Sequence, residues 1–185
     1  MDHDQEREIV ISVLAGDRQA YARLIDAYKN AIFNLAYRMT GSLQEAEDLA
    51  QETFLRAYEK LWRFNPGKSF FVWLYTIGLN LIRNHLKRKK KSESRDLAGE
   101  GERAEAGTRA GDQPEGILLE DEKQKRLQAC LLKLPADLRE AVVLRFYDDR
   151  SFEEIARICG ISLSAAKMRV YRGIEKLQGM MEKSE

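Results

Sequence analysis

The segment at residues 91–116, KSESRDLAGEGERAEAGTRAGDQPEG, divides the chain into two parts. It contains no aromatic residue, and its only large aliphatic side chain is Leu97. Such a segment buries too little apolar surface to offset the conformational entropy that it would lose on folding. The sequence therefore predicts two separate domains, residues 1–91 and 117–185, joined by a flexible acidic linker at residues 92–116.

Both flanking parts have the pattern of helices. The 185 residues include only 3 prolines, and apolar side chains recur at helical spacing instead of alternating as they do in strands. The predicted fold is therefore all-α, with two small helical domains. Because no run of about 18 uncharged apolar residues is present, we expect no membrane insertion of the chain itself. The first residues, MDHDQERE, lack the basic and apolar parts of a signal peptide, which predicts a cytoplasmic protein.

Several classes of function have no support in the sequence. Cys130 and Cys159 lie among apolar helical neighbours, which predicts buried free thiols, and His3 and His85 do not complete a zinc-binding pattern. The chain has no Gly-rich phosphate loop and no histidine near a nucleophile, so we expect neither an enzyme nor a bound metal or cofactor. Because the net charge is only +1, any affinity for nucleic acid has to come from local basic patches.

Residues 151–178 have the pattern of a helix-turn-helix. Ser151 and Glu154 form an S-x-x-E capping box that begins the first helix, Gly160 lies in the turn, and Ser162 can cap the second helix. The second helix carries one apolar stripe that is expected to face the domain interior, made of Leu163, Ala166, Val170, Ile174 and Leu177.

The outward face of this second helix combines small residues with cations. It presents Ser164, Ala165, Met168 and Arg172, with Lys167 and Arg169 at its edges. Small residues allow close approach to DNA, and long cations reach phosphates or the acceptor edge of guanine. This pattern favours a DNA-recognition helix; the alternative is an ordinary solvated helix of mixed charge.

In the amino-terminal part, glycines and capping residues indicate where helices end. Gly16 and Gly41 end the first two helices, and Ser42 with Glu45 forms a capping box that begins a third, which reaches about Trp62. The remaining helices are predicted at residues 70–90, 117–132 and 135–147.

The third helix carries a leucine among charged and amide side chains. Its outward face is made of Asp48, Gln51, Glu52, Leu55 and Glu59. One incidental leucine on a solvated acidic face is common. The alternative is a docking surface, where the leucine enters a partner and the acids meet its basic residues.

The helix at residues 70–90 carries a polar stripe of Thr76, Asn80, Arg83, Asn84 and Lys87. Amide and cationic donors on one ridge suit base edges and phosphates. The loop before this helix, residues 63–69, contains Phe64, Asn65 and Lys68, and an aromatic ring at this loop can stack on an unpaired base.

Three blocks in this order, EAEDLAQETFLRAYEKLWRF, SFFVWLYTIGLNLIRNHLKRKKK and SFEEIARICGISLSAAKMRVYRGIEKL, resemble a bacterial RNA polymerase sigma factor of the extracytoplasmic-function group of the sigma-70 family. The resemblance covers nearly the whole chain. It implies a factor that binds core RNA polymerase and directs promoter-specific initiation, with domains of the region 2 and region 4 type. The partners that it implies are the β′ and β subunits, promoter DNA in duplex and single-stranded form, and an anti-sigma factor.

The resemblance also implies a role for each surface. Contacts with the clamp helices of β′ would come from Asp48, Gln51, Glu52 and Leu55. The minus-ten element, with an unpaired base, would be bound by Phe64, Asn65, Lys68, Asn80, Arg83, Asn84 and Lys87. The minus-thirty-five element would be bound by Ser164, Ala165, Lys167, Met168, Arg169 and Arg172. Met168 stands where many relatives have serine, which favours an apolar base contact such as a thymine methyl.

Two other functions remain open at this point. A stand-alone helix-turn-helix regulator would explain residues 151–178, but it leaves the leucine-bearing face and the polar stripe without a role. A helical adaptor with no nucleic-acid role would predict that neither Lys167 nor Arg172 affects any DNA-dependent activity.

Overall fold

The computed structural model describes residues 1–96 and 122–182, and every regular element within them is helical. The amino-terminal lobe consists of α1 (His3–Leu14), α2 (Tyr21–Thr40), α3 (Leu43–Lys60) and α4 (Phe70–Asp96). The carboxy-terminal lobe consists of α5 (Glu122–Lys133), α6 (Ala136–Phe146), α7 (Phe152–Cys159) and α8 (Leu163–Glu182). Short 3₁₀ helices lie at Arg18–Ala20 and Leu61–Arg63. The predicted all-α fold is confirmed.

The boundary of the predicted linker differs in one respect. Helix α4 continues to Asp96, so residues 92–96 are helical although they were predicted as linker. The rest of the predicted linker, and residues 117–121 of the helix predicted after it, lie outside the described residues.

The helix-turn-helix is capped as its sequence predicts. The Ser151 hydroxyl accepts a hydrogen bond from the Glu154 N–H at 3.2 Å, and the Glu154 carboxylate accepts one from the Ser151 N–H at 2.9 Å. Gly160 then ends α7 with a φ of 69°, in the left-handed region that glycine enters without steric cost. The Ser162 hydroxyl accepts from the Ala165 N–H and begins α8.

The second predicted capping box is only half formed. The Ser42 hydroxyl accepts from the Glu45 N–H at 3.3 Å, but the Glu45 carboxylate pairs with Lys89 of α4 at 2.7 Å. A contact between two helices has therefore replaced the local bond that the sequence predicts.

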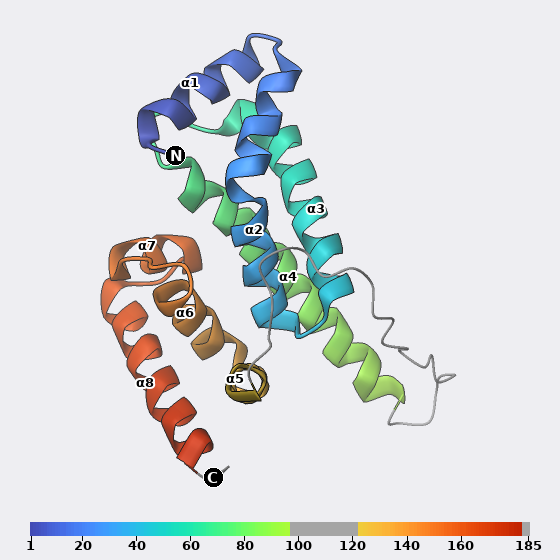
Figure 1. Ribbon diagram of the computed structural model, residues 1–185, viewed down its shortest axis with the longest axis vertical. Coiled ribbons are helices and arrows are strands. Elements are labelled where there is room, and N and C mark those ends of the chain that lie inside the picture. The colour runs from blue at the N-terminus through green and yellow to red at the C-terminus, as the bar shows by residue number, and fades with distance from the viewer. Residues whose placement is uncertain (97–121, 183–185) are drawn as a thin grey trace.

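In the amino-terminal lobe, α2, α3 and α4 pack around one core, and α1 lies across their end (Figure 1). The inward stripe of α3 is buried as its spacing predicts, including Ala46, Leu49 and Thr53. In the carboxy-terminal lobe, α8 buries Ala166, Val170 and Leu177 as predicted, whereas Leu163 at its first position is exposed.

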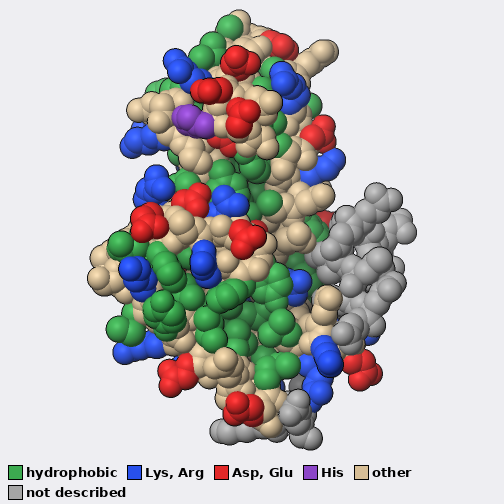
Figure 2. All heavy atoms as spheres, turned by 60° about the vertical axis from the view of Figure 1, so that its left-hand side comes forward, with side chains coloured by type: hydrophobic (Ala, Val, Ile, Leu, Met, Phe, Trp, Pro, Cys, Tyr) green, Lys and Arg blue, Asp and Glu red, His purple; other side chains and the backbone are tan. Residues whose placement is uncertain are grey.

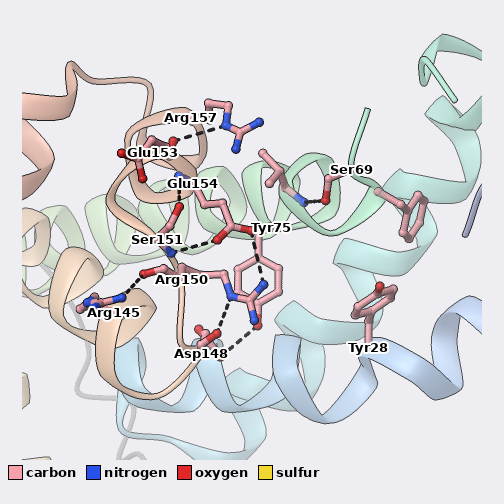
Figure 3. A network of polar contacts seen from close by, with 12 residues as sticks. Tyr28, Ser69, Tyr75, Arg145, Asp148, Arg150, Ser151, Glu153, Glu154 and Arg157 are labelled. Carbon is pink, nitrogen blue, oxygen red and sulfur yellow. Dashed lines mark hydrogen bonds and ion pairs between the residues drawn. The ribbon is translucent and has the colours of Figure 1, made fainter. Parts of the chain in front are cut away.

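The two lobes contact each other, which the sequence did not indicate. The Tyr75 hydroxyl of α4 donates to Asp148 Oδ1, after α6, at 3.1 Å (Figure 3). The Gln128 amide of α5 donates to the carbonyl oxygen of Tyr37 in α2 at 3.3 Å. One buried apolar cluster includes residues of both lobes. Apolar packing as well as these hydrogen bonds therefore holds the two lobes together in a closed arrangement.

Gly173 allows α8 to approach α6 closely. A Cβ at this position would clash with Val142 Cγ2 and lie 3.3 Å from the Leu138 carbonyl oxygen. We expect Gly173→Ala to lower the free energy of unfolding by about 1–3 kcal/mol, the usual cost of overpacking. Gly179→Ala is the matched control, because a Cβ there meets nothing within 4 Å. Urea denaturation followed by circular dichroism measures both, and equal effects would contradict the close contact.

Asp148 makes the stability of the closed arrangement depend on pH. Burial raises the pKa of Asp148 from 3.8 to about 7, Asp149 adds to the rise, and Tyr75 and Arg150 oppose it. The folded state therefore holds this proton more tightly than the unfolded chain. Its contribution to stability is complete below about pH 4 and is lost as the pH rises through about 7.

We therefore expect Asp148→Asn to flatten the decline in unfolding free energy between about pH 5.5 and about pH 8. Urea denaturation at the two pH values measures this slope. Asp149→Asn, at an exposed neighbouring acid, should keep most of the wild-type slope. A decline of wild-type size in Asp148→Asn would rule out Asp148 as its source.

Candidate polymerase and nucleic-acid interfaces

An apolar groove of about 830 Å³ runs between α2 and α3. Its apolar lining comes from both helices and consists of Tyr21, Ile25, Phe33, Ala50, Phe54, Leu55 and Tyr58. Lys29, Asn30, Glu47 and Gln51 add polar groups to it. The α2 side of the groove was missed from sequence. Its signal was a second set of apolar residues on α2, Ile25 and Phe33, beside the stripe that fills the core.

Of the four residues predicted to contact β′, two line this groove and two lie outside it. Leu55 is 61% exposed and lines the groove together with Gln51. Asp48 and Glu52 do not line it; they lie on the outer side of α3, where Asp48 is exposed and Glu52 pairs with Arg56 one turn along the helix. The leucine is therefore part of a larger apolar surface, and the two acids flank that surface.

The loop at residues 63–69 borders a second cavity, of about 510 Å³, at the start of α4. Asn65 and Lys68 line it with Trp73 and Thr76. The loop holds a fixed shape because Asn65 Oδ1 accepts from the Gly67 N–H and the Asn65 carbonyl accepts from the Lys68 N–H, both at 2.9 Å. Amide, cationic and aromatic groups, the kinds of group that bind an unpaired base, thus surround this cavity.

Phe64 is not free to stack on a base. Its side chain is 6% exposed, and its ring centroid lies 5.5 Å from that of Phe70 and 5.1 Å from that of Trp73. Phe64 therefore forms a wall of the cavity and part of the core. The exposed ring near this loop is Trp62, which is 71% exposed and has the Arg63 guanidinium 5.1 Å from its centroid.

Glu6 of α1 supports this loop, although sequence reasoning gave it no role. Its carboxylate is buried, accepts from the Phe70 N–H at 3.2 Å and accepts from the Tyr28 hydroxyl. The Phe70 N–H is one of the free donors at the start of α4, where a carboxylate is favoured by the helix dipole. The sequence around Glu6 gives no signal of this contact, because Glu6 is one of several charged residues just before the apolar run that begins at Ile9.

The polar stripe of α4 is only partly open. Asn80, Asn84 and Lys87 are exposed, as a strand-binding role requires. Arg83 instead pairs with Glu140 of α6: Nε lies 2.8 Å from Oε1 and Nη2 lies 2.6 Å from Oε2. The hydrogen bonds to Glu140 raise the pKa of Arg83, so its positive charge is fixed.

The outward face of α8 is accessible. Ser164, Lys167, Met168 and Arg172 are exposed, as predicted. Ala165 and Arg169 are half-buried, and Arg169 Nε lies 3.6 Å from Asp137 Oδ2.

Tyr171 is a further exposed residue of this face that sequence reasoning missed, although its position between Val170 and Arg172 places it beside the outward residues. Figure 2 shows a broad hydrophobic area on this lobe bordered by Lys and Arg side chains.

Two family models match this chain. Sigma-70 region 2 matches residues 24–92, and Sigma-70, region 4 matches residues 124–177. The chain is 38% identical over 170 residues to the ECF RNA polymerase sigma factor SigW of Bacillus subtilis, with 90% of this chain and 91% of that protein covered. It is 31% identical to the RNA polymerase sigma-H factor of Pseudomonas aeruginosa, with 98% and 96% covered.

Solved structures show the same fold. CnrH in complex with the cytosolic domain of CnrY superposes with a TM-score of 0.73 at 24% identity, covering 98% of this chain and 99% of that one. RpoE of Bartonella quintana in complex with the anti-sigma factor NepR gives a TM-score of 0.66 at 26% identity, covering 88% and 96%. Among the described helices, none has the length and apolar character needed to cross a membrane. The chain belongs to the extracytoplasmic-function (ECF) sigma factors of the sigma-70 family, which direct transcription initiation by RNA polymerase.

Proposed function

We propose that this sigma factor binds core RNA polymerase through the groove between α2 and α3. The observation that carries the proposal is the apolar lining of this groove, with Leu55 exposed at its wall. An exposed apolar surface of this kind marks an interaction site in a monomeric protein. Asp48 and Glu52 beside it supply charge that can steer a basic partner. The clamp helices of β′ are the partner that the family relationship favours.

The two lobes then divide promoter recognition between them. The cavity beside residues 63–69 and the open stripe residues Asn80, Asn84 and Lys87 offer donors and rings to an unpaired strand of the minus-ten element. Helix α8 offers exposed cations and the apolar Met168 to the major groove of the minus-thirty-five element. No covalent chemistry is required, because holding an unstacked base stabilises the open strand.

We also propose that this protein acts in the cytoplasm and that it binds an anti-sigma factor. The similarity to RpoE, whose solved structure is a complex with the anti-sigma factor NepR, supports this partner. The carboxy-terminal lobe exposes Phe146 and Tyr147, and Figure 2 shows a hydrophobic area on this lobe. Apolar surface of this character suits such a partner or the β subunit.

Transcription with purified core polymerase tests the function directly. The protein is expected to direct initiation at a defined set of promoters, which share a motif that can be read from the transcripts. Tight binding to duplex DNA by the protein alone, with no promoter-specific initiation in the presence of core enzyme, would favour a stand-alone regulator instead.

The double substitution Leu55→Ala and Asp48→Ala should weaken binding to core polymerase at least about tenfold, because the leucine is the apolar anchor of the surface. Fluorescence anisotropy of labelled protein titrated with core enzyme measures the dissociation constant. Leu14→Ala is the control, because Leu14 is exposed on α1 outside the groove. The helical content should not change; unfolding of the double variant would remove the assignment of these residues to the surface.

Lys167→Ala and Arg172→Ala should each weaken holoenzyme binding to a duplex that carries the minus-thirty-five element by about threefold to tenfold. If the cation contacts a phosphate, the salt dependence of log K should fall by about one unit of slope. Titrations at several salt concentrations measure both quantities. Lys125→Ala, at an exposed lysine of α5, should have neither effect.

A further inference from the structure

The Trp62 side chain is 71% exposed, more than any other large hydrophobic side chain in the part of the chain that the structure describes. It lies two positions after the end of α3 and does not line the groove between α2 and α3. An indole placed at a surface in this way offers a flat apolar face to a partner. The residues around Trp62 indicate which partner suits it.

The backbone holds Trp62 in a fixed position. Trp62 lies in the short 3₁₀ helix Leu61–Arg63, between two buried side chains, those of Leu61 and Phe64. The Phe64 N–H donates to the Leu61 carbonyl oxygen at 2.9 Å and closes this turn. Because Leu61 and Phe64 are anchored in the core, the indole is presented at a defined place. Binding a ligand there therefore costs little further ordering of the backbone.

Arg63 connects the indole to the cavity beside residues 63–69. Its guanidinium carbon lies 5.1 Å from the centroid of the Trp62 ring, and the same side chain lines the cavity. Arg63 is exposed, and no carboxylate among the described residues pairs with it. In a nucleic-acid strand, one phosphate joins each two neighbouring nucleotides. A guanidinium between a base cavity and an exposed indole is therefore suited to the phosphate that joins two bound bases.

The charge of the chain changes sign close to Trp62. Helix α3 carries five acidic residues, the last of them Glu59, whereas residues 60–92 contain nine Lys and Arg residues and no Asp or Glu. The acids of α3 suit the basic partner that is proposed for the face with Leu55. The surface after α3 suits a polyanion instead, and an unpaired DNA strand is a polyanion that also offers flat bases. This change of charge favours DNA over a continuation of the polymerase contact.

We propose that Trp62 stacks on a second unpaired base of the minus-ten strand, next to the base that enters the cavity, and that Arg63 binds the phosphate between these two bases. This inference rests on the proposed function, because it adds a second base site to the strand-binding surface beside residues 63–69. Trp62 and Arg63 are thus strand contacts in addition to Asn65 and Lys68.

The two base sites have different tasks in this arrangement. The cavity surrounds its base with amide and cationic groups, which can meet the edge of the base. Trp62 meets only the face of a base, and every base has such a face. The indole therefore adds affinity for the opened strand with little preference for sequence. It adds nothing to duplex binding, because the bases of a duplex are already stacked on one another.

The test measures binding of the holoenzyme to a fluorescent single strand, which carries the non-template minus-ten sequence of a promoter that the holoenzyme transcribes. Trp62→Leu keeps an apolar side chain but removes the ring, and we expect it to weaken strand binding at least about fivefold. Trp62→Tyr keeps a ring and should stay within about threefold of the wild type. Both variants should bind a minus-thirty-five duplex within about twofold of the wild type.

Strands with a single abasic nucleotide locate the stacked base. At one position, the abasic strand should bind the wild-type holoenzyme at least about fivefold more weakly than the intact strand. The same abasic strand should bind the Trp62→Leu holoenzyme within about twofold of the intact strand, because the ring that the missing base would contact is already absent. Ile11→Ala is the control, because Ile11 is an exposed apolar residue of α1, and it should respond to the abasic strands as the wild type does.

The contact of Arg63 with a phosphate has its own measurement. Arg63→Gln should lower the slope of log K against log salt for the single strand by about 0.7, the value for one phosphate of a single strand. Lys125→Gln, at an exposed lysine of α5, should leave this slope unchanged. An unchanged slope in Arg63→Gln would overturn the phosphate contact.

The outcomes separate this inference from the proposed function. Strand binding by Trp62→Leu equal to that of the wild-type holoenzyme would overturn the stacking and leave the proposed function intact. Equally weakened binding of Trp62→Leu to core polymerase and to every abasic strand would assign the indole to a polymerase contact and overturn the stacking as well. Failure of the wild-type holoenzyme to bind the strand would overturn the strand-binding function itself, and the second base site with it.

Discussion

The relative position of the two lobes depends on the buried guanidinium of Arg139. This α6 side chain is 9% exposed and donates to the carbonyl oxygen of Met39, near the end of α2, and to that of Leu132, near the end of α5. It also donates to the carbonyl oxygen of Leu134 at 3.2 Å. The last carbonyls of a helix have no partner within that helix, and their partial negative charge favours a cation. One residue therefore satisfies a helix end from each lobe, and burial lowers its pKa without removing its charge.

Glu6 has the equivalent role inside the amino-terminal lobe, at the opposite kind of helix end. Its carboxylate accepts from the Phe70 N–H at the start of α4, so α1 is tied to the residue that follows the loop at residues 63–69. The shape of the cavity beside residues 63–69 consequently depends on α1, a helix that has no proposed contact with DNA. In both cases a charged side chain that is distant in sequence replaces the water that an exposed helix end would bind.

Local signals made most of the fold predictable from the sequence. Capping by Ser151 and helix termination at Gly160 depend on residues within four positions, and the buried stripe of α3 follows from helical spacing alone. The predictions that differ from the structure concern contacts that are distant in sequence. Glu45 pairs with Lys89 and not with its own helix start, and the Phe64 ring, which was predicted to be open to an unpaired base, is buried by tertiary packing.

The candidate sites were predictable in part for the same reason. The outward residues of α8 are set by one helix, so their exposure could be read from its period. The groove beside Leu55 needs two helices, and the pairing of Arg83 with Glu140 needs two lobes. The second wall of the groove had a signal only in α2 itself, and the acid opposite Arg83 has no signature in the sequence near Arg83. Side chains on separate helices are brought together only by the packing of the whole chain.

The small net charge of +1 reflects acids of the chain, some of which pair with cations of the candidate DNA-binding surfaces. A permanently exposed basic ridge binds any DNA through phosphates, so its affinity carries no sequence information. Pairing with the chain's own acids reduces that non-specific binding to a degree that depends on burial. The Asp137 side chain is 51% exposed, and an exposed pair of this kind holds Arg169 only weakly. The Glu140 side chain is 3% exposed, so water and salt screen its pair with Arg83 far less. The difference in burial between these two acids therefore leaves the Arg169 cation of α8 more available to a phosphate than the Arg83 cation of α4.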